Sequence, residues 1–249
     1  MVTRHDVNQL NHALSSVSDD AAYFLEEFFR TVDLSRPEAV RDALLEVVPA
    51  VTREYGDLSA TVAAEWYEET RAKEIGGRYS ARLGATTPDD EVRGTVRWAA
   101  GELFGDNPEG TLAVLRGALQ RHVMYGGRDT IARNVDFDPS RPRWARVPSG
   151  VHTCAFCSML ASRGFVYKNK QGALMDQSGN KYHDDCHCQP VPSWDSEQAH
   201  ISGYDPDALF AVYDRAAGIV GNRTDTREIT KVMRRLEPDA FTDGVHPII

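Results

Sequence analysis

The sequence predicts an α+β protein with a helical N-terminal arm, a small β-containing Cys/His module and C-terminal helices. Apolar residues recur at helical spacing through the first half. All four cysteines of the 249-residue chain lie between Cys154 and Cys188, and helix-start signals follow this stretch. We expect the helical domain to cover residues 1–127, the Cys/His module residues 128–200 and the helical tail residues 201–249.

The N-terminal arm contains several predicted helices separated by turn residues. The expected helical segments are 6–32, 36–55, 57–75, 92–104 and 109–125, with residues 84–88 as a linker. Asp19 is read as a fresh helix start and Ser35 as the cap of the second helix. Pro49 predicts a bend, and Gly56 and Gly126 predict helix ends.

Aromatic residues are concentrated near the end of the first expected helix. They are Tyr23, Phe24, Phe28 and Phe29. We interpret them as core residues, with a docking surface for a partner helix as the alternative.

The Cys/His module reads as short strands and turns. Residues 143–147 alternate like a strand, and residues 157–163 can form one or two helical turns. Further expected strands are 165–167 and 189–191, with a hairpin turn at 176–180 that leads into Lys181-Tyr182. The tail predicts helices at 206–221 and 226–236, followed by a loose end or a short docking strand.

The cysteines show the spacing of a metal site. Two residues separate Cys154 from Cys157, which lets both sulfurs point the same way, as one edge of a tetrahedral zinc site requires. Cys186 and Cys188 lie on the same side of an extended chain. Thiolates at this density favour zinc over harder metals. We predict a structural zinc whose ligands, four cysteines or three cysteines and a histidine, come from Cys154, Cys157, His183, Cys186 and Cys188.

Two structural disulfides, or buried thiols without a metal, are the alternatives. No secretory signal opens the chain, so we expect an intracellular protein with reduced thiols. A catalytic zinc of the nucleobase deaminase kind is disfavoured, because that pattern has a glutamate two residues after its histidine, whereas His152 is followed by Cys154. A small sheet is marginally stable alone, and a metal that joins its ends adds its binding free energy to folding.

Composition and charge narrow the classes of function. The chain has 41% hydrophobic and 26% charged residues, as a globular protein does. No apolar run approaches the roughly 20 residues of a membrane span, so we expect no membrane partner. The formal net charge of −9 argues against broad nonspecific binding to duplex DNA.

One region has the opposite charge balance. The stretch from Arg121 to Arg146 contains six arginines and three aspartates. We expect either a modest basic patch that contacts packaged DNA or an acidic partner, or an ordinary solvated face.

The residues around the cysteines resemble a known family. A segment with Trp144 is followed by HTCAFCSMLASRGFVY, a glycine-bearing loop and HDDCHCQPVP. Residues 125–195 thereby resemble the Mu F-like minor capsid, or head morphogenesis, domain of tailed phages, which typically reads TCxxCxxL, a glycine, a hairpin region, then HxxCxC and a short strand. The matching residues are Thr153, Cys154, Cys157, Leu160, Gly164, His183, Cys186 and Cys188. The family often has arginine where this chain has His187, and Ala161-Ser162-Arg163 lengthens the first half.

The resemblance implies a virion protein present in few copies inside the capsid near the portal, and in the host cytoplasm during assembly. It implies the portal protein, the major capsid protein, or both as partners, a role in head assembly or DNA delivery, and no catalytic residues.

Two other classes of function stay open. A metal-dependent nuclease or other DNA-acting enzyme delivered with the genome could use His183, Asp184 and Asp185 as metal ligands, although no phosphate loop, His-Glu-x-x-His or Gly-x-Ser-x-Gly motif is present. A zinc-ribbon nucleic-acid-binding protein would show salt-sensitive DNA binding, which the acidic balance disfavours.

Overall fold

The computed structural model describes residues 1–149, 153–167, 182–195 and 200–245, and it divides into two compact units. The first, here called the helical unit, comprises residues 12–134 and 176–186. The second, here called the mixed unit, comprises residues 1–11, 135–175 and 187–249. Each unit is therefore assembled from segments that are distant in the sequence.

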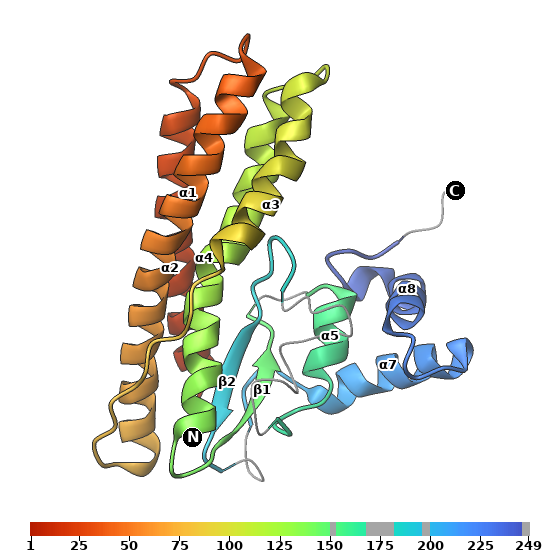
Figure 1. The fold of residues 1–249 in the computed structure, drawn as a ribbon. Helices are drawn as coiled ribbons and strands as arrows, with labels where there is room; N and C mark the ends of the chain where they lie inside the picture. Colours follow the sequence, from red (N-terminus) through yellow and green to blue (C-terminus); the bar gives the residue numbers. More distant parts are fainter. Residues whose placement is uncertain (150–152, 168–181, 196–199, 246–249) are drawn as a thin grey trace. The chain divides into compact units, whose positions relative to one another are not determined.

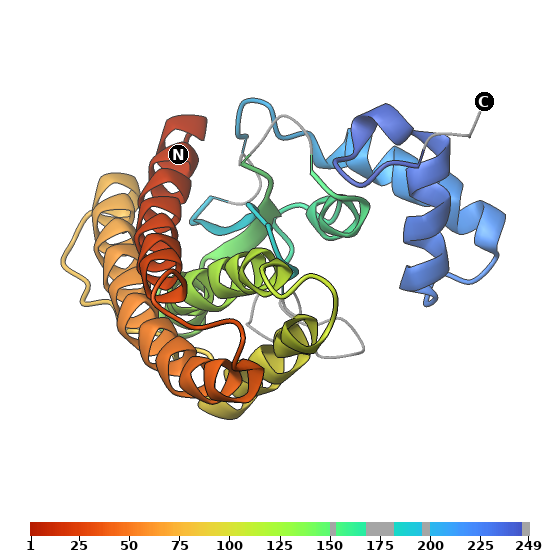
Figure 2. The ribbon, with the colours of Figure 1, turned by 90° about the horizontal axis from the view of Figure 1, so that it is seen from above.

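Four long helices form the helical unit, and they run along one another (Figures 1 and 2). They are α1 (Arg4–Phe29), α2 (Pro37–Ile75), α3 (Asp89–Ala99) with the 3-10 turn η1 (Ala100–Phe104), and α4 (Gly110–Phe137). Their apolar faces meet in one core cluster. Its buried members are Val17, Ala21, Leu25, Phe29, Val40, Leu44, Val48, Val51, Val92, Val96, Ala99, Ala100, Leu103, Leu115, Leu119 and Val123.

The helices are longer than the turn residues predicted. The break at Asp19 is wrong: Asp19 is exposed, and the buried stripe of α1 continues on either side of it with Val17 and Ala21. The end at Gly56 is also wrong, because α2 continues through Pro49 and Gly56 to Ile75. Burial of the apolar stripe outweighs the poor helix propensity of these residues.

The start of α2 also differs from the prediction. Arg36 is the N-cap residue and makes no side-chain cap hydrogen bond. The hydroxyl of Ser35 instead donates to the Asp33 carboxylate at 2.7 Å. The predicted cap at Ser35 is therefore wrong, because the serine is used in the turn before the helix.

Glycines allow α4 to approach α2 closely. The predicted helix end at Gly126 is wrong, because α4 continues to Phe137. A Cβ atom on Gly126 would lie 2.2 Å from the carbonyl oxygen of Gly56. A Cβ atom on Gly127 would lie 2.9 Å from the hydroxyl oxygen of Ser59, which accepts a hydrogen bond from the Gly127 amide at 3.2 Å. The missing side chains are thus a packing requirement and not a stop signal.

The predicted linker is an extended segment that lies on α4. Asn134 accepts from the amide of Arg82 at 2.9 Å, and Thr130 accepts from the amide of Gly84 at 2.8 Å. Asp129 accepts from the next amide along the segment, at 2.9 Å. Polar side chains of α4 therefore satisfy a backbone that has no sheet partner.

A buried histidine on α4 has a lowered pKa. His122 is 2% exposed, and its Nε2 lies 3.1 Å from the Thr95 hydroxyl and 3.3 Å from Arg121 Nη2. Burial, and then the charge of Arg121, lower the pKa of His122 from 6.5 to about 3. The ring is therefore neutral in the folded protein at neutral pH, and Nε2 accepts from the guanidinium.

The mixed unit contains a two-stranded antiparallel sheet and short helices (Figure 1). Strands β1 (Arg143–Val147) and β2 (Gln189–Ser193) pair with Val147 opposite Gln189. The helices are α5 (Ala155–Ala161), α7 (Pro206–Val220), α8 (Thr226–Leu236) and the turn η2 (Pro238–Ala240). A second core joins α5 to α7 and α8 through Ala155, Met159, Leu160, Ala216, Ala217, Ile229, Met233 and Phe241.

The α+β class and most elements of this unit are confirmed. Both strands and the helices after Asp205 lie where the sequence predicted them, and Asp205 caps α7 through the amides of Asp207 and Ala208. The predicted strand at 165–167 is reduced to one bridge, Tyr167 with Trp144. The hairpin turn at 176–180 with Lys181, and the chain end at 247–249, lie outside the described residues.

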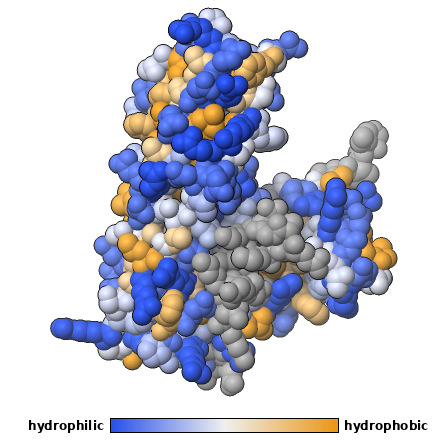
Figure 3. Space-filling view, in the orientation of Figure 1, coloured by the Kyte–Doolittle hydropathy of each residue, from blue (hydrophilic) through white to orange (hydrophobic). Residues whose placement is uncertain are grey.

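Most of the visible surface of the helical unit is hydrophilic, with hydrophobic side chains scattered over it (Figure 3). Exposed aromatic residues include Tyr23 and Phe24 on α1, Trp98 on α3 and Phe104 in η1. The core interpretation holds for Phe29, which is buried, but is wrong for Tyr23 and Phe24. Across the described residues, the helices are too short or too polar to traverse a bilayer.

Replacement of Gly126 tests the close approach of α4 to α2. We expect Gly126→Ala to lower the free energy of unfolding by about 2 kcal/mol or more, because overpacking against rigid backbone outweighs the gain in helix propensity. Gly94→Ala is the matched control: the space around Gly94 on α3 is open, so the variant should gain up to about 1 kcal/mol. Urea denaturation measures both, and equal stabilisation by the two substitutions would contradict the packing role.

The lowered pKa of His122 predicts that the folded protein loses stability in mild acid. The unfolded chain takes up a proton as the pH falls below 6.5, whereas folded His122 does so only near pH 3, so stability is lost across this window. The contribution at pH 5 is a loss of about 2 kcal/mol relative to pH 7. His122→Gln, measured by urea denaturation in the same buffers, should lose that much less on acidification. An identical loss in both proteins would exclude His122 as the cause.

Candidate metal centre

Helix α5 and strand β2 fix the positions of three cysteines in the mixed unit. Cys154 is the N-cap of α5, and its Sγ accepts from the amide of Cys157 at 3.3 Å. The carbonyl of Cys154 accepts from the amide of Ser158 at 2.9 Å, which closes the first turn. Cys188 directly precedes β2. The Cys-x-x-Cys turn is thus the start of a helix, which brings both sulfurs to one end of α5.

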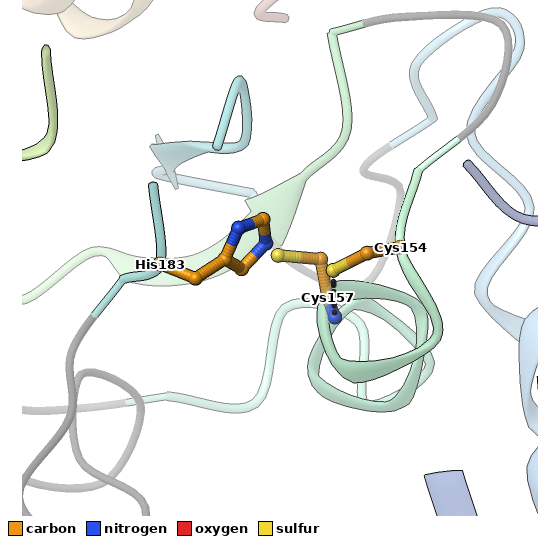
Figure 4. A group of neighbouring side chains, drawn as sticks. All are labelled: Cys154, Cys157 and His183. Atoms are coloured by element: carbon orange, nitrogen blue, oxygen red, sulfur yellow. Dashed lines mark hydrogen bonds between the residues drawn. The ribbon is translucent and has the colours of Figure 1, made fainter. Parts of the chain in front are cut away.

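Among the described residues, two groups of side chains could hold a metal ion. Cys154, Cys157 and His183 form one group, which Figure 4 shows with the imidazole turned toward the two sulfurs. Cys157, Cys186 and Cys188 form the other. Within each group the ligand atoms lie within 4.8 Å of one another, and Cys157 belongs to both.

Outer hydrogen bonds orient two of these ligands. Nδ1 of His183 lies 2.6 Å from the carbonyl oxygen of Asp184. Because a carbonyl only accepts, Nδ1 carries the proton and the lone pair is on Nε2, the tautomer that a metal ligand needs. The hydroxyl of Thr153 lies 3.3 Å from Sγ of Cys188, where it can donate to a metal-bound thiolate.

The Cys186 segment is held on α4 inside the helical unit. Arg128 Nη2 donates to the carbonyl of Cys186, and the guanidinium carbon lies 4.0 Å from the ring centroid of Tyr182. Arg121 forms an ion pair with Asp184 at 3.0 Å. Cys186 is 2% exposed. The backbone that carries His183 and Cys186 is therefore fixed by two arginines of one helix.

The donor set fits zinc. All four cysteines are buried and none is in a disulfide, so the disulfide alternative is not the state that the structure describes. Four thiolates, or three thiolates and one imidazole, are usual ligand sets of a structural zinc, whereas harder cations need oxygen ligands. The structure gathers the five predicted ligands into the two groups. Which four of them bind stays a prediction.

Sequence reasoning missed the burial of two arginines, one of which, Arg128, contacts the Cys186 segment. Arg128 and Arg146 were counted in a basic patch, but both are fully buried and cannot contact DNA directly. Of the six arginines in that stretch, Arg141 is exposed. Their burial has no local signal in the sequence, since each stands among residues of ordinary polarity. Contact with DNA stays a prediction.

Fold and site together define the class: an α+β protein with a Cys/His group that can hold a structural metal. A family model described as "VG15 protein" matches residues 1–216, which is most of the chain. The protein belongs to the VG15 protein family.

Its relatives are phage proteins. The chain is 28% identical over 200 residues to the Gene 15 protein of Mycobacterium phage L5, in an alignment that covers 61% of this chain and 65% of that protein. It is 31% identical over 167 residues to the Gene 15 protein of Mycobacterium phage D29, covering 52% and 60% respectively. The chain thus spans less than two thirds of the length of these relatives. No solved structure matches. The expectation of a phage family is confirmed.

Cys157 provides a direct test of the metal centre, because it belongs to both groups. Wild-type protein purified under reducing conditions should contain about one zinc ion per chain, and Cys157→Ser should lose nearly all of it. Ser158→Ala is the matched control, because Ser158 is the adjacent buried residue and its hydroxyl has no hydrogen-bond partner within the described part of the chain. Elemental analysis measures the ratio. Less than about half an equivalent in wild-type protein would count against the site.

Proposed function

We propose that this protein is a minor capsid, or head morphogenesis, protein of a tailed phage. It acts inside the capsid near the portal, with the portal protein, the major capsid protein, or both as partners. Its role is structural, and its Cys/His module contains one structural zinc ion. Before packaging, the protein is in the host cytoplasm, where heads assemble.

The convergence of the motif residues carries this proposal. The Mu F-like resemblance rests on TCxxCxxL and HxxCxC, and the five Cys and His residues of these motifs are the members of the two ligand groups. They come from segments about thirty residues apart in the sequence. Membership of a family with phage relatives supports the same assignment independently.

The proposed zinc would stabilise the small sheet of this fold. A sheet of two five-residue strands is marginally stable alone. Zinc bound by the Cys154 and Cys188 sides of the motif would join the start of α5 to the start of β2. Its binding free energy would then stabilise the fold of the module. Burial of all four cysteines supports a structural role, since a catalytic zinc keeps a position open to solvent.

Exposed aromatic residues of the helical unit support a partner-binding role. Tyr23 is 64% exposed and Trp98 is 70% exposed, on two of the helices that form this unit. Large aromatic side chains are enriched in interfaces, where burial of their area stabilises the complex. We propose that the capsid or portal partner covers these side chains.

The proposal predicts that the protein is packaged. Mass spectrometry of gradient-purified virions and proheads should detect it at a few copies per particle, well below the major capsid protein. A DNA-replication protein of the same phage, abundant in the lysate, serves as the control for contamination. A protein found only in the unassembled fraction of the lysate would rule out the minor capsid role.

A complementation experiment tests the interface. A phage that lacks the gene should be rescued by the wild-type chain, whereas Tyr23→Ser with Trp98→Ser should enter particles at least tenfold less. Phe210→Ser with Ile219→Ser removes comparable exposed apolar area from α7 and should be packaged normally. Equal incorporation of both double variants would contradict the assignment of the interface to the helical unit.

A further inference from the structure

Arg128 is fully buried, and none of the described residues forms an ion pair with it. Its side chain is 0% exposed, and Nη2 donates to the carbonyl of Cys186. One face of the guanidinium covers the Tyr182 ring, and Nη2 also lies 3.7 Å from the sulfur of Met124. Nε and Nη1 have no hydrogen-bond partner among the described residues.

Two other arginines of this helix, Arg116 and Arg121, form ion pairs with carboxylates. Arg121 pairs with Asp184 at 3.0 Å, and Arg116 pairs with Glu26, both at partly exposed positions. No carboxylate among the described residues forms an ion pair with Arg128. An isolated buried charge is strongly unfavourable, so buried cations are normally paired with an anion. The described side chains therefore leave Arg128 without the anion that a buried cation normally has.

We propose that Arg128 is a positioning residue for the metal centre and that the metal-bound thiolates are its counter-charge. This inference rests on the zinc proposed above. A zinc ion with three or four cysteine ligands has a net negative charge, because each bound thiol has lost its proton. The hydrogen bond to the Cys186 carbonyl holds the guanidinium on the same residue that supplies a sulfur ligand.

Two contributions follow from this arrangement. The hydrogen bond and the stacking on Tyr182 fix the backbone at Cys186, so the thiol is held in place before the metal arrives. The positive charge favours the loaded, negatively charged centre over the empty one. A residue that only filled space in α4 would provide neither.

Replacement of Arg128 separates the contributions. Zinc affinity is measured at fixed pH by competition with a chromophoric chelator, and the ligand field is followed with Co²⁺ as a spectroscopic probe. We expect Arg128→Met, which preserves volume, to weaken zinc binding about 10- to 100-fold, as loss of an outer-shell partner does. Arg128→Lys, which preserves the charge but not the planar contact with Tyr182, should fall between Met and wild type. Arg116→Met removes the same charge from an exposed position of α4 and should change affinity less than about twofold.

The outcomes are distinguishable. Wild-type affinity in Arg128→Met, or equal losses in the Lys and Met variants, would overturn the counter-charge inference while leaving the zinc site intact. Circular dichroism with excess zinc checks that the helices of each variant are folded. If Arg128→Met does not fold, Arg128→Gln, which removes the charge and retains a side-chain donor, is compared with Arg116→Gln: a loss of more than about threefold in Arg128→Gln alone supports the inference, and equal affinities overturn it. A wild-type chain without zinc would overturn the metal proposal itself.

Discussion

The helical unit depends on helix α4, and above all on the absence of side chains at two of its positions. Gly126 and Gly127 let the helix approach α2 to a distance that a Cβ atom would prevent. Beyond this contact, Asp129, Thr130 and Asn134 bind the extended segment that joins α2 to α3. One helix therefore provides apolar packing and polar support in consecutive turns, so its axis fixes the positions of its neighbours in the unit.

The sequence predicts the helical arm well wherever helix boundaries are taken from the continuous apolar stripe. The predicted boundaries are wrong where a turn residue inside the stripe is taken as a helix start or end. The helices from Asp205 onward begin and end close to their predicted residues because caps and periodicity agree. Gly56 and Gly126 were predicted to end helices, and the prediction is wrong because glycine also permits close contact between two helices. Only the neighbouring helix distinguishes these uses, and the neighbour is not encoded locally.

The candidate site also has a part that the sequence predicts and a part that it does not. Ligand spacing is local, so Cys154 and Cys157 could be assigned to one turn from the sequence, and the structure forms that turn as the start of α5. The residues that hold the second half are distant: Arg128 lies 58 positions from Cys186. In the sequence Arg128 is one arginine among six, and a basic patch is the natural reading. Its full burial removes Arg128 from any such surface patch, because a fully buried cation is not accessible to a phosphate and is normally paired inside the protein.

The buried charge of Arg128 and the charge of the proposed metal centre are opposite in sign. A thiolate-rich zinc centre and a buried guanidinium are each unfavourable alone, because each places net charge in a medium that solvates it poorly. In the proposed arrangement each charge would compensate the other, and the hydrogen bond from Arg128 to the Cys186 carbonyl fixes the guanidinium beside one of the proposed ligand residues. Arg128 and Cys186 both belong to the helical unit, and Arg128 is on the same helix as Gly126 and Gly127. Loss of the metal would then leave α4 with an uncompensated buried charge, so the cost of an empty site would extend into the helices.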